Sequence, residues 1–193
     1  MPYFFGIKTP LTNIEDLAKA LQELERCYIP IEVAVPDALH VTVLYVGRRA
    51  PKNDVIYKIS GELTKIGKII FKITNKVELY PSTAKPRALV LKIDDRYGKL
   101  REARRILINI LKQYNIPIED RFIHDFNPHI TLGRIRSKLT YRDAIEILEN
   151  VSINIPEMTV EASYVELIDS TGGSYKVISR ISTLPQTQDQ DTL

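Results

Sequence analysis

Two histidines occur in the same short pattern, and their residue types and spacing suit chemistry on a small charged group. His40 and Thr42 form one pair, and His129 and Thr131 form the other. Side chains of a β-strand alternate between its two faces, so each histidine shares a face with its threonine, about 6.6 Å along the strand at roughly 3.3 Å per residue. The apolar side chains between them point to the other face. The two side chains of each pair can therefore bind one small group from one side.

The two pairs start 129 − 40 = 89 residues apart and use two of the three histidines in the chain. That separation is too long for a local motif. It suits a duplicated unit whose two copies are brought face to face, with one histidine–threonine strand on each side of a groove.

The two pairs together indicate phosphoryl transfer without a metal ion. The unperturbed histidine pKa lies close to neutrality, so one histidine can act as a base and the other as an acid. Threonine hydroxyls can donate to the non-bridging oxygens of a phosphate. Arg134 lies on the opposite nominal face from Thr131, but Gly133 between them can bulge the strand and re-aim the guanidinium at the same phosphate. A strained cyclic phosphodiester is a natural substrate for such a site.

The composition is that of an ordinary globular protein with a mildly basic balance. The 193 residues are 44% hydrophobic and 26% charged, with a formal net charge of +3, which is compatible with a phosphate-bearing partner. Cys27 is the only cysteine, so a disulfide framework and a cysteine-based zinc site within one chain are excluded, and a cytoplasmic setting fits best. No apolar run reaches the roughly 18 residues of a membrane span, and the N-terminus lacks the features of a signal peptide.

The hydrophobic periodicity predicts two halves with the same order of elements: strand, helix, histidine–threonine strand, helix, strand. In the first half the expected elements are a strand Pro2–Ile7, a helix from Thr9 to Leu24, a strand Leu39–Val46, a helix Asn53–Ile66 and a strand Lys68–Leu79. In the second half they are a strand Ala88–Ile93, a helix Asp95–Tyr114, the strand with His129, a helix Thr140–Asn150 capped by Thr140, and a hairpin made of Met158–Ile168 and Tyr175–Ile181.

We therefore expect one domain over residues 1–182, built from half-repeats of about 2–80 and 87–181. Residues 183–193 are polar and rich in Gln and Asp, which is typical of a disordered tail.

The two H-x-T-x motifs resemble those of the 2H phosphoesterase superfamily. The resemblance is closer to its LigT-like branch, the RNA 2′,3′-cyclic phosphodiesterases that are also called 2′–5′ RNA ligases. It extends over most of the chain, through the segments Tyr3–Ile7, Leu39–Gly47, Lys85–Leu91, Phe126–Arg134 and Glu166–Tyr175. Two such motifs in register with a duplicated architecture are far more specific than one.

This resemblance implies a fold and an activity. The fold is α+β and bilobal, with two duplicated lobes of antiparallel sheet around a central cleft and the helices on the outside. The activity is hydrolysis of a 2′,3′-cyclic phosphate at an RNA end to a 2′-phosphomonoester, with 2′–5′ ligation as the reverse reaction. His129 is assigned as the base and His40 as the acid, while Thr42, Thr131 and Arg134 hold the phosphate. No cofactor or metal is implied.

The expected partners are RNA ends that carry a 2′,3′-cyclic phosphate, with tRNA halves as a candidate source, or nucleoside 2′,3′-cyclic phosphates. A monomer without membrane association is expected. The segment Ile31–Pro36 departs from the family pattern and is a candidate lining of the base pocket. Candidates for stacking on an RNA base are Phe126, Tyr45 and Tyr28, because RNA bases are often held on aromatic faces.

Other readings of the same residues remain open. A binding module for RNA ends without turnover, or a 2H enzyme acting on a small cyclic nucleotide or on an ADP-ribose cyclic phosphate, would carry the same motifs. The third histidine, His124, is expected to be a loop residue and not a metal ligand. Arg104 and Arg105 are expected on a solvated helix face, Asp37 and Asp125 as solvated acids, and Tyr80 and Pro81 as a turn.

Overall fold

The computed structural model describes residues 2–9, 31–34, 38–136, 138–140 and 157–185, with four further residues between 142 and 148. The helix expected from Thr9 to Leu24 lies outside the described residues, as does most of the helix Thr140–Asn150. The predicted cap of that second helix is confirmed, because Thr140 Oγ1 accepts a hydrogen bond from the Asp143 amide at 3.2 Å and Asp143 Oδ2 accepts one from the Thr140 amide at 2.8 Å.

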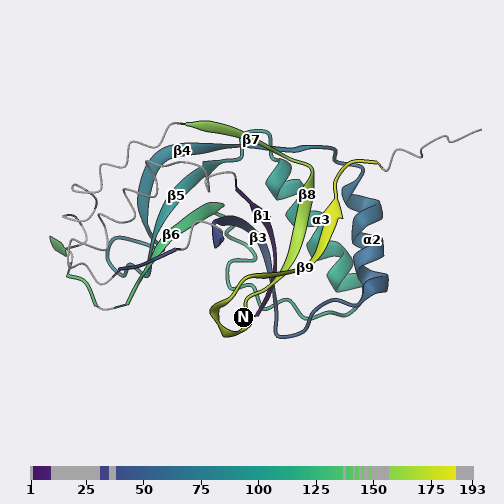
Figure 1. Cartoon of the computed structure of the whole chain (residues 1–193), viewed down its shortest axis with the longest axis horizontal. Coiled ribbons are helices and arrows are strands. Elements are labelled where there is room, and N and C mark those ends of the chain that lie inside the picture. The colour runs from purple at the N-terminus through teal and green to yellow at the C-terminus, as the bar shows by residue number, and fades with distance from the viewer. Residues whose placement is uncertain are drawn as a thin grey trace, which may run out of the picture.

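The described strands form one antiparallel sheet of nine strands in the order β7-β4-β5-β6-β3-β1-β8-β9, with β2 paired to β6 (Figure 1). Their bounds are β1 Tyr3–Lys8, β2 Ile31–Val33, β3 His40–Gly47, β4 Ile69–Tyr80, β5 Ala88–Asp94, β6 His129–Ile135, β7 Met158–Ala162, β8 Tyr164–Asp169 and β9 Lys176–Ser182. A short 3-10 turn, Thr171–Gly173, joins β8 to β9.

Each half of the chain supplies strands to both halves of this sheet. β3, β1, β8 and β9 form one half, and β6, β5, β4 and β7 form the other. β4 pairs with β5 and β7, whereas β8, which comes much later in the chain, pairs with β1. Figure 1 shows β4, β5 and β6 curving away from β1, β3 and β8. The expected α+β class with antiparallel lobes is confirmed, and the last strands of the two halves are exchanged.

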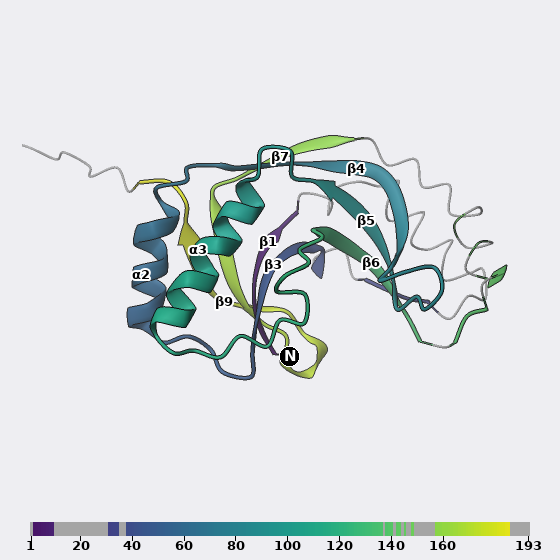
Figure 2. The same cartoon turned by 180° about the vertical axis from the view of Figure 1, so that it is seen from behind.

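Two described helices, α2 Asn53–Leu63 and α3 Lys99–Gln113, pack side by side on the outer face of the sheet (Figure 2). Their apolar faces are buried in one core with the inward side chains of the strands, among them Val41 and Ile130, which are fully buried. Because side chains alternate along β3 and β6, burying these residues turns the histidines and threonines to the opposite face. No helix among the described residues is long and apolar enough to cross a membrane.

Two predicted elements differ from the structure, and one observed strand was not predicted. Helix α3 begins at Lys99 and not at Asp95, because the Asp95 carboxylate accepts hydrogen bonds from the Leu100 and Arg101 amides, both at 3.1 Å, and so remains outside the helix. The run Met158–Ile168 is two strands with a break at Ser163, since β7 pairs with β4 and β8 pairs with β1. The three-residue strand β2 was not predicted.

Candidate active site

A cavity of about 420 Å³ lies on the face of the sheet where β3 and β6 meet, and the two histidine–threonine pairs line it. His40, Thr42, His129, Thr131 and Arg134 all contribute to its wall. The structure thus brings together, in one place, the five residues to which the sequence assigned proton transfer and phosphate binding.

The arrangement is nearly symmetric about one residue pair. Val41 of β3 lies opposite Ile130 of β6 in an antiparallel register. Because the strands run in opposite directions, His40 lies across from Thr131, and Thr42 lies across from His129. Each histidine therefore has the threonine of the other motif as its neighbour across the strands.

Both histidine rings are held by the same kind of hydrogen bond. His40 Nδ1 lies 2.6 Å from the carbonyl oxygen of Ala38, and His129 Nδ1 lies 2.8 Å from that of Asn127, in each case two residues earlier. A carbonyl can only accept, so Nδ1 carries the proton, and Nε2 of the neutral ring is left to give or take a proton. Backbone carbonyls hold the rings, and the exposed Asp125 is not needed for this; Asp37 lies outside the described residues.

Each histidine also lies against one aromatic ring. The Phe4 and His40 ring centroids are 4.7 Å apart with an interplanar angle of 30°, and those of Tyr80 and His129 are 4.4 Å apart at 31°. Tyr80 was expected only as part of a turn; it ends β4, and its ring lies beside the second histidine.

Burial lowers the pKa of both histidines, and nearby positive charges lower the pKa of His40 further. For His40, loss of solvation is the main cause, and the hydrogen bond to Ala38 opposes it; the positive charges of Arg134 and Lys8 lower the pKa further. For His129, loss of solvation lowers the pKa, and the bond to Asn127 opposes it. Both side chains therefore favour the neutral form at neutral pH.

Arg134 reaches the cavity because β6 contains a bulge. Leu89 of β5 pairs with Gly133 and Val90 pairs with Thr131, so one extra residue of β6 is accommodated between these pairs. The extra residue shifts the alternation, and Thr131 and Arg134 line the same cavity, as the glycine at position 133 suggested.

Gly133 is also a point of close approach between strands. A Cβ atom there would lie 2.5 Å from Ile31 Cγ2 and 3.2 Å from the Glu32 carbonyl oxygen. Only glycine therefore allows β2 to pair with β6 at this distance.

Glu32, Val33 and Ala34 of the segment Ile31–Pro36 also line the cavity, as expected of that segment, whereas Tyr175 had no assigned role. Arg134 Nη2 donates to Tyr175 Oη at 3.1 Å, and the Tyr175 ring centroid lies 5.2 Å from that of His40. Tyr175 follows the glycine turn between β8 and β9, and that turn was the available signal. On the opposite side, Glu32 of β2 forms an ion pair with Arg136, and both line the cavity.

The three stacking candidates have different locations. Tyr45 lines the cavity. Phe126 does not; the guanidinium of Arg104 lies 4.7 Å from its ring centroid. Tyr28 is outside the described residues.

His124 is exposed, and the described part of the chain contains no group of three or more His, Cys, Asp or Glu side chains that could hold a metal ion.

Arg104 is buried, so its expected place on a solvated helix face was wrong, although the neighbouring Arg105 is exposed. Its guanidinium forms an ion pair with Asp120 at 2.9 Å and donates to the Val43 carbonyl at 2.6 Å and the Phe122 carbonyl at 2.9 Å. This one side chain ties helix α3 to β3 and to the loop that precedes His129. Arg104 therefore helps to hold β3 and the loop that leads into β6 in place, and these segments carry the two histidines.

Solved structures with the same fold support this assignment of the architecture. The chain matches the crystal structure of TT0787 from Thermus thermophilus with a TM-score of 0.68 at 18% identity, covering 96% of this chain and 100% of that one. It matches E. coli LigT in apo form with a TM-score of 0.55 at 18% identity, covering 94% and 96% of the two chains. It matches the PDE domain of MHV ns2 with a TM-score of 0.52 at 13% identity, covering 88% and 99%.

No curated protein matches the sequence. A family model does match, over residues 12–173, and its description is the 2′-5′ RNA ligase superfamily. This range contains both histidine–threonine motifs and nearly all of the described cavity. Together with the fold, the match shows that the chain belongs to the 2′-5′ RNA ligase superfamily of 2H phosphoesterases.

Proposed function

We propose that the chain is an RNA 2′,3′-cyclic phosphodiesterase that converts a terminal 2′,3′-cyclic phosphate into a 2′-phosphomonoester without a metal ion. The observation that carries the proposal is the matched pair of histidines, each with Nδ1 tied to a carbonyl and both lining one cavity with two threonines and an arginine. An acid and a base supplied from two strands suit a reaction in which one bond forms while another breaks.

In the proposed reaction, His129 Nε2 takes a proton from water as the water oxygen attacks phosphorus. His40, in its protonated form, gives its proton to the 3′-oxygen as the bond from phosphorus to that oxygen breaks. One P–O bond forms and one breaks, and the two histidines exchange protonation states. Thr42, Thr131 and Arg134 hold the non-bridging oxygens, where the guanidinium stabilises the charge of the transition state.

The same site would join two RNA ends when the 5′-hydroxyl of one end takes the place of water. His129 would then take the proton of that hydroxyl, His40 would again protonate the departing 3′-oxygen, and the product is a 2′–5′ linkage. Crystal structures of E. coli LigT in complex with 3′-AMP and with phosphate support a nucleotide and a phosphate as occupants of such a cavity. A cytoplasmic setting and a monomeric state belong to the same proposal.

Turnover measured in EDTA tests the proposal. The substrates are 2′,3′-cyclic AMP and an RNA oligonucleotide with a 2′,3′-cyclic phosphate end, and the variants are His40→Ala and His129→Ala. We expect a 2′-phosphate product from the parent protein and a loss of about 10² to 10⁴ in kcat for each variant, the usual contribution of general acid–base catalysis. His124→Ala is the matched control, because the third histidine is exposed and lies outside the cavity wall.

A substrate with sulfur in place of the bridging 3′-oxygen separates the two roles, because a thiolate leaves without needing a proton. His40→Ala should regain activity on it and His129→Ala should not; the opposite result would exchange the acid and the base. Tight binding without turnover by the parent protein would indicate a binding module. Turnover of the mononucleotide but not of RNA would indicate an enzyme for small cyclic nucleotides.

A further inference from the structure

A second cavity, of about 500 Å³, lies over β4 and β5 beside the first one. Four basic side chains of these strands and the turn after β5 line it: Lys72, Lys76, Lys92 and Arg96. Asn127 and Pro128, which immediately precede the catalytic histidine of β6, form part of its wall. The two cavities are therefore neighbours along the chain, because Pro128 lines the second cavity and the next residue, His129, lines the first.

The strand register places Lys92 and Lys72 on the histidine face of the sheet. Lys92 of β5 lies directly opposite His129 of β6, and directly opposed residues of an antiparallel pair point to the same face. Asp94, two residues further along β5, points the same way and lies opposite Lys72 of β4. A line of charged side chains thus starts beside His129 and leads away from it across two strands.

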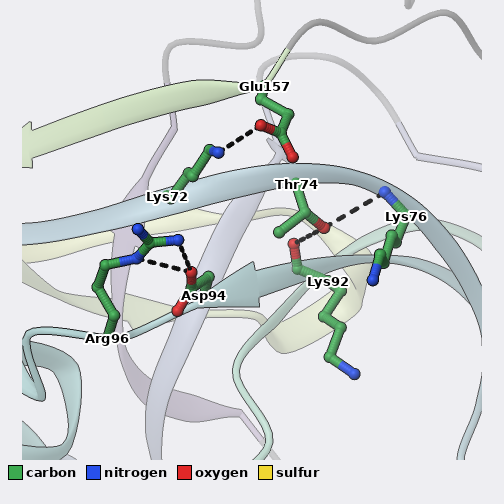
Figure 3. A network of polar contacts seen from close by, with 7 residues as sticks. All are labelled: Lys72, Thr74, Lys76, Lys92, Asp94, Arg96 and Glu157. Carbon is green, nitrogen blue, oxygen red and sulfur yellow. Dashed lines mark hydrogen bonds and ion pairs between the residues drawn. The ribbon is translucent and has the colours of Figure 1, made fainter.

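The strand lysines of this surface and Arg96 pair with carboxylates that are at least partly exposed. Lys72 pairs with Glu157 and Arg96 donates to Asp94, as Figure 3 shows. Lys92 pairs with Glu78 at 3.1 Å. Ion pairs of this kind contribute little to stability and are screened by salt, so a stronger anion can replace the carboxylate.

Lys76 adds a further charge to this surface. In Figure 3 it follows Lys72 and Thr74 along β4, and it makes no ion pair with any described residue. Lysine ammonium groups are compact point charges that suit phosphate oxygens and do not distinguish one base from another.

We propose that the second cavity is a subsite for the phosphodiester backbone of the RNA that continues from the reacting end, held by Lys72, Lys76 and Lys92. This inference rests on the proposed function, because an RNA chain whose cyclic phosphate lies between the histidines must leave the first cavity. The lysine ammonium groups, which start opposite His129, give the anionic RNA backbone a continuous cationic path. Binding there is independent of base sequence and depends on salt.

The test compares a 2′,3′-cyclic mononucleotide with RNA oligonucleotides of increasing length that carry the same end. For the parent protein, kcat/KM should increase with length. In the variant Lys72→Gln/Lys76→Gln/Lys92→Gln, the increase should disappear, with a 10-fold to 100-fold higher KM for the oligonucleotides, since each lysine neutralises about one phosphate. The mononucleotide kcat/KM should change by less than about twofold, because the second cavity does not hold it.

Salt dependence gives an independent readout. For single-stranded nucleic acid, the slope of log kcat/KM against log salt concentration should become shallower by about 0.7 for each phosphate that the protein no longer neutralises, so by about 2 for the triple variant. The control is Lys58→Gln/Lys65→Gln/Lys112→Gln, which removes the same charge from exposed positions on and next to the two helices. An equal effect of the control would indicate a general charge effect and would overturn the subsite.

Binding of the oligonucleotide, measured by fluorescence anisotropy, keeps the two proposals separable. If the parent protein turns over neither substrate, the proposed function fails, but weaker binding by the triple variant still supports the subsite. If the parent protein hydrolyses both substrates and the triple variant matches it on both, the function stands and the subsite is overturned. Loss of the length dependence in Lys8→Gln alone, on the strand that pairs with β3 at His40, would place the RNA exit on the other side and also overturn the subsite.

Discussion

Val41 lies directly opposite Ile130, and this residue pair joins the two histidine strands at the centre of the sheet. Both side chains are completely buried in the core, so the four polar side chains next to them all emerge on the cavity face. The relative position of the two histidines is therefore set by core packing and by a strand register, and no flexible loop contributes to it.

The pH dependence of turnover follows from the lowered pKa of both histidines. In the proposed mechanism His129 must be neutral to accept a proton, so activity rises with pH through its pKa. His40 must be charged to donate a proton, so activity falls as pH rises through its pKa. Because burial holds both below 6.5, the optimum of kcat/KM should lie below pH 6.5. A mononucleotide assay from about pH 4 to about pH 8 measures this. An optimum above neutrality would show that burial does not control these groups in the free enzyme.

Tyr175→Phe tests the contact between the closing hairpin and Arg134, the arginine that we propose holds the phosphate. The substitution removes the hydroxyl that accepts a hydrogen bond from Arg134 and keeps the ring beside His40. We expect KM to rise by about 2-fold to 10-fold with a smaller change in kcat, because one hydrogen bond contributes about 0.5 to 1.5 kcal/mol. Tyr175→Ala, which also removes the ring, should cost more; equal effects of the two would show that the hydroxyl does nothing.

Gly133→Ala should push β2 away from β6. The new Cβ would lie 2.5 Å from Ile31 Cγ2, and we expect a loss of about 1 to 3 kcal/mol in the free energy of unfolding, as in other overpacked sites. Urea denaturation measures this loss.

Gly61→Ala is the matched control for that substitution. Gly61 lies on helix α2 with no atom near the position of a Cβ, so alanine should raise stability by about 0.5 to 1 kcal/mol. The two glycine variants should therefore shift the denaturation midpoint in opposite directions. A destabilisation common to both would mean that the approach of β2 to β6 is not the cause.

Arg104→Met should destabilise the fold strongly, because it leaves Asp120 buried without its cation. Losing one partner of a buried ion pair costs about 3 to 5 kcal/mol. The matched control is Arg105→Met on the exposed face of the same helix, which should stay within about 0.5 kcal/mol of the parent protein. Adding Asp120→Asn to Arg104→Met should restore part of the stability by removing the unpaired charge, and a further loss instead would contradict this account.

The strands that carry chemistry were predictable because local pattern and function coincide there. In His40–Val43 and in the strand with His129, strict alternation fixes which side chains share a face, whatever the rest of the fold does. The glycine at 133 even indicated the bulge that brings Arg134 to the cavity.

The remainder of the site depends on contacts between distant segments, which a local pattern does not contain. β2 is only three residues long, and pairing with β6 makes it a strand. Arg104 is charged and lies on an amphipathic helix, so only its partner Asp120 explains its burial. The break at Ser163 reflects a change of partner strand, and Tyr175 meets Arg134 across 41 residues of sequence.

The exchange of last strands between the two halves has a consequence for synthesis. β1 is synthesised before its neighbour β8, and the two strands pair with Tyr3 opposite Asp169. The edge of β1, the strand that pairs with the first histidine strand, therefore stays unpaired until β8 has been made, and contacts so distant in sequence form slowly. A nascent or truncated chain that stops before β8 already contains both histidines and yet should be inactive and prone to aggregation, because this sheet edge is open.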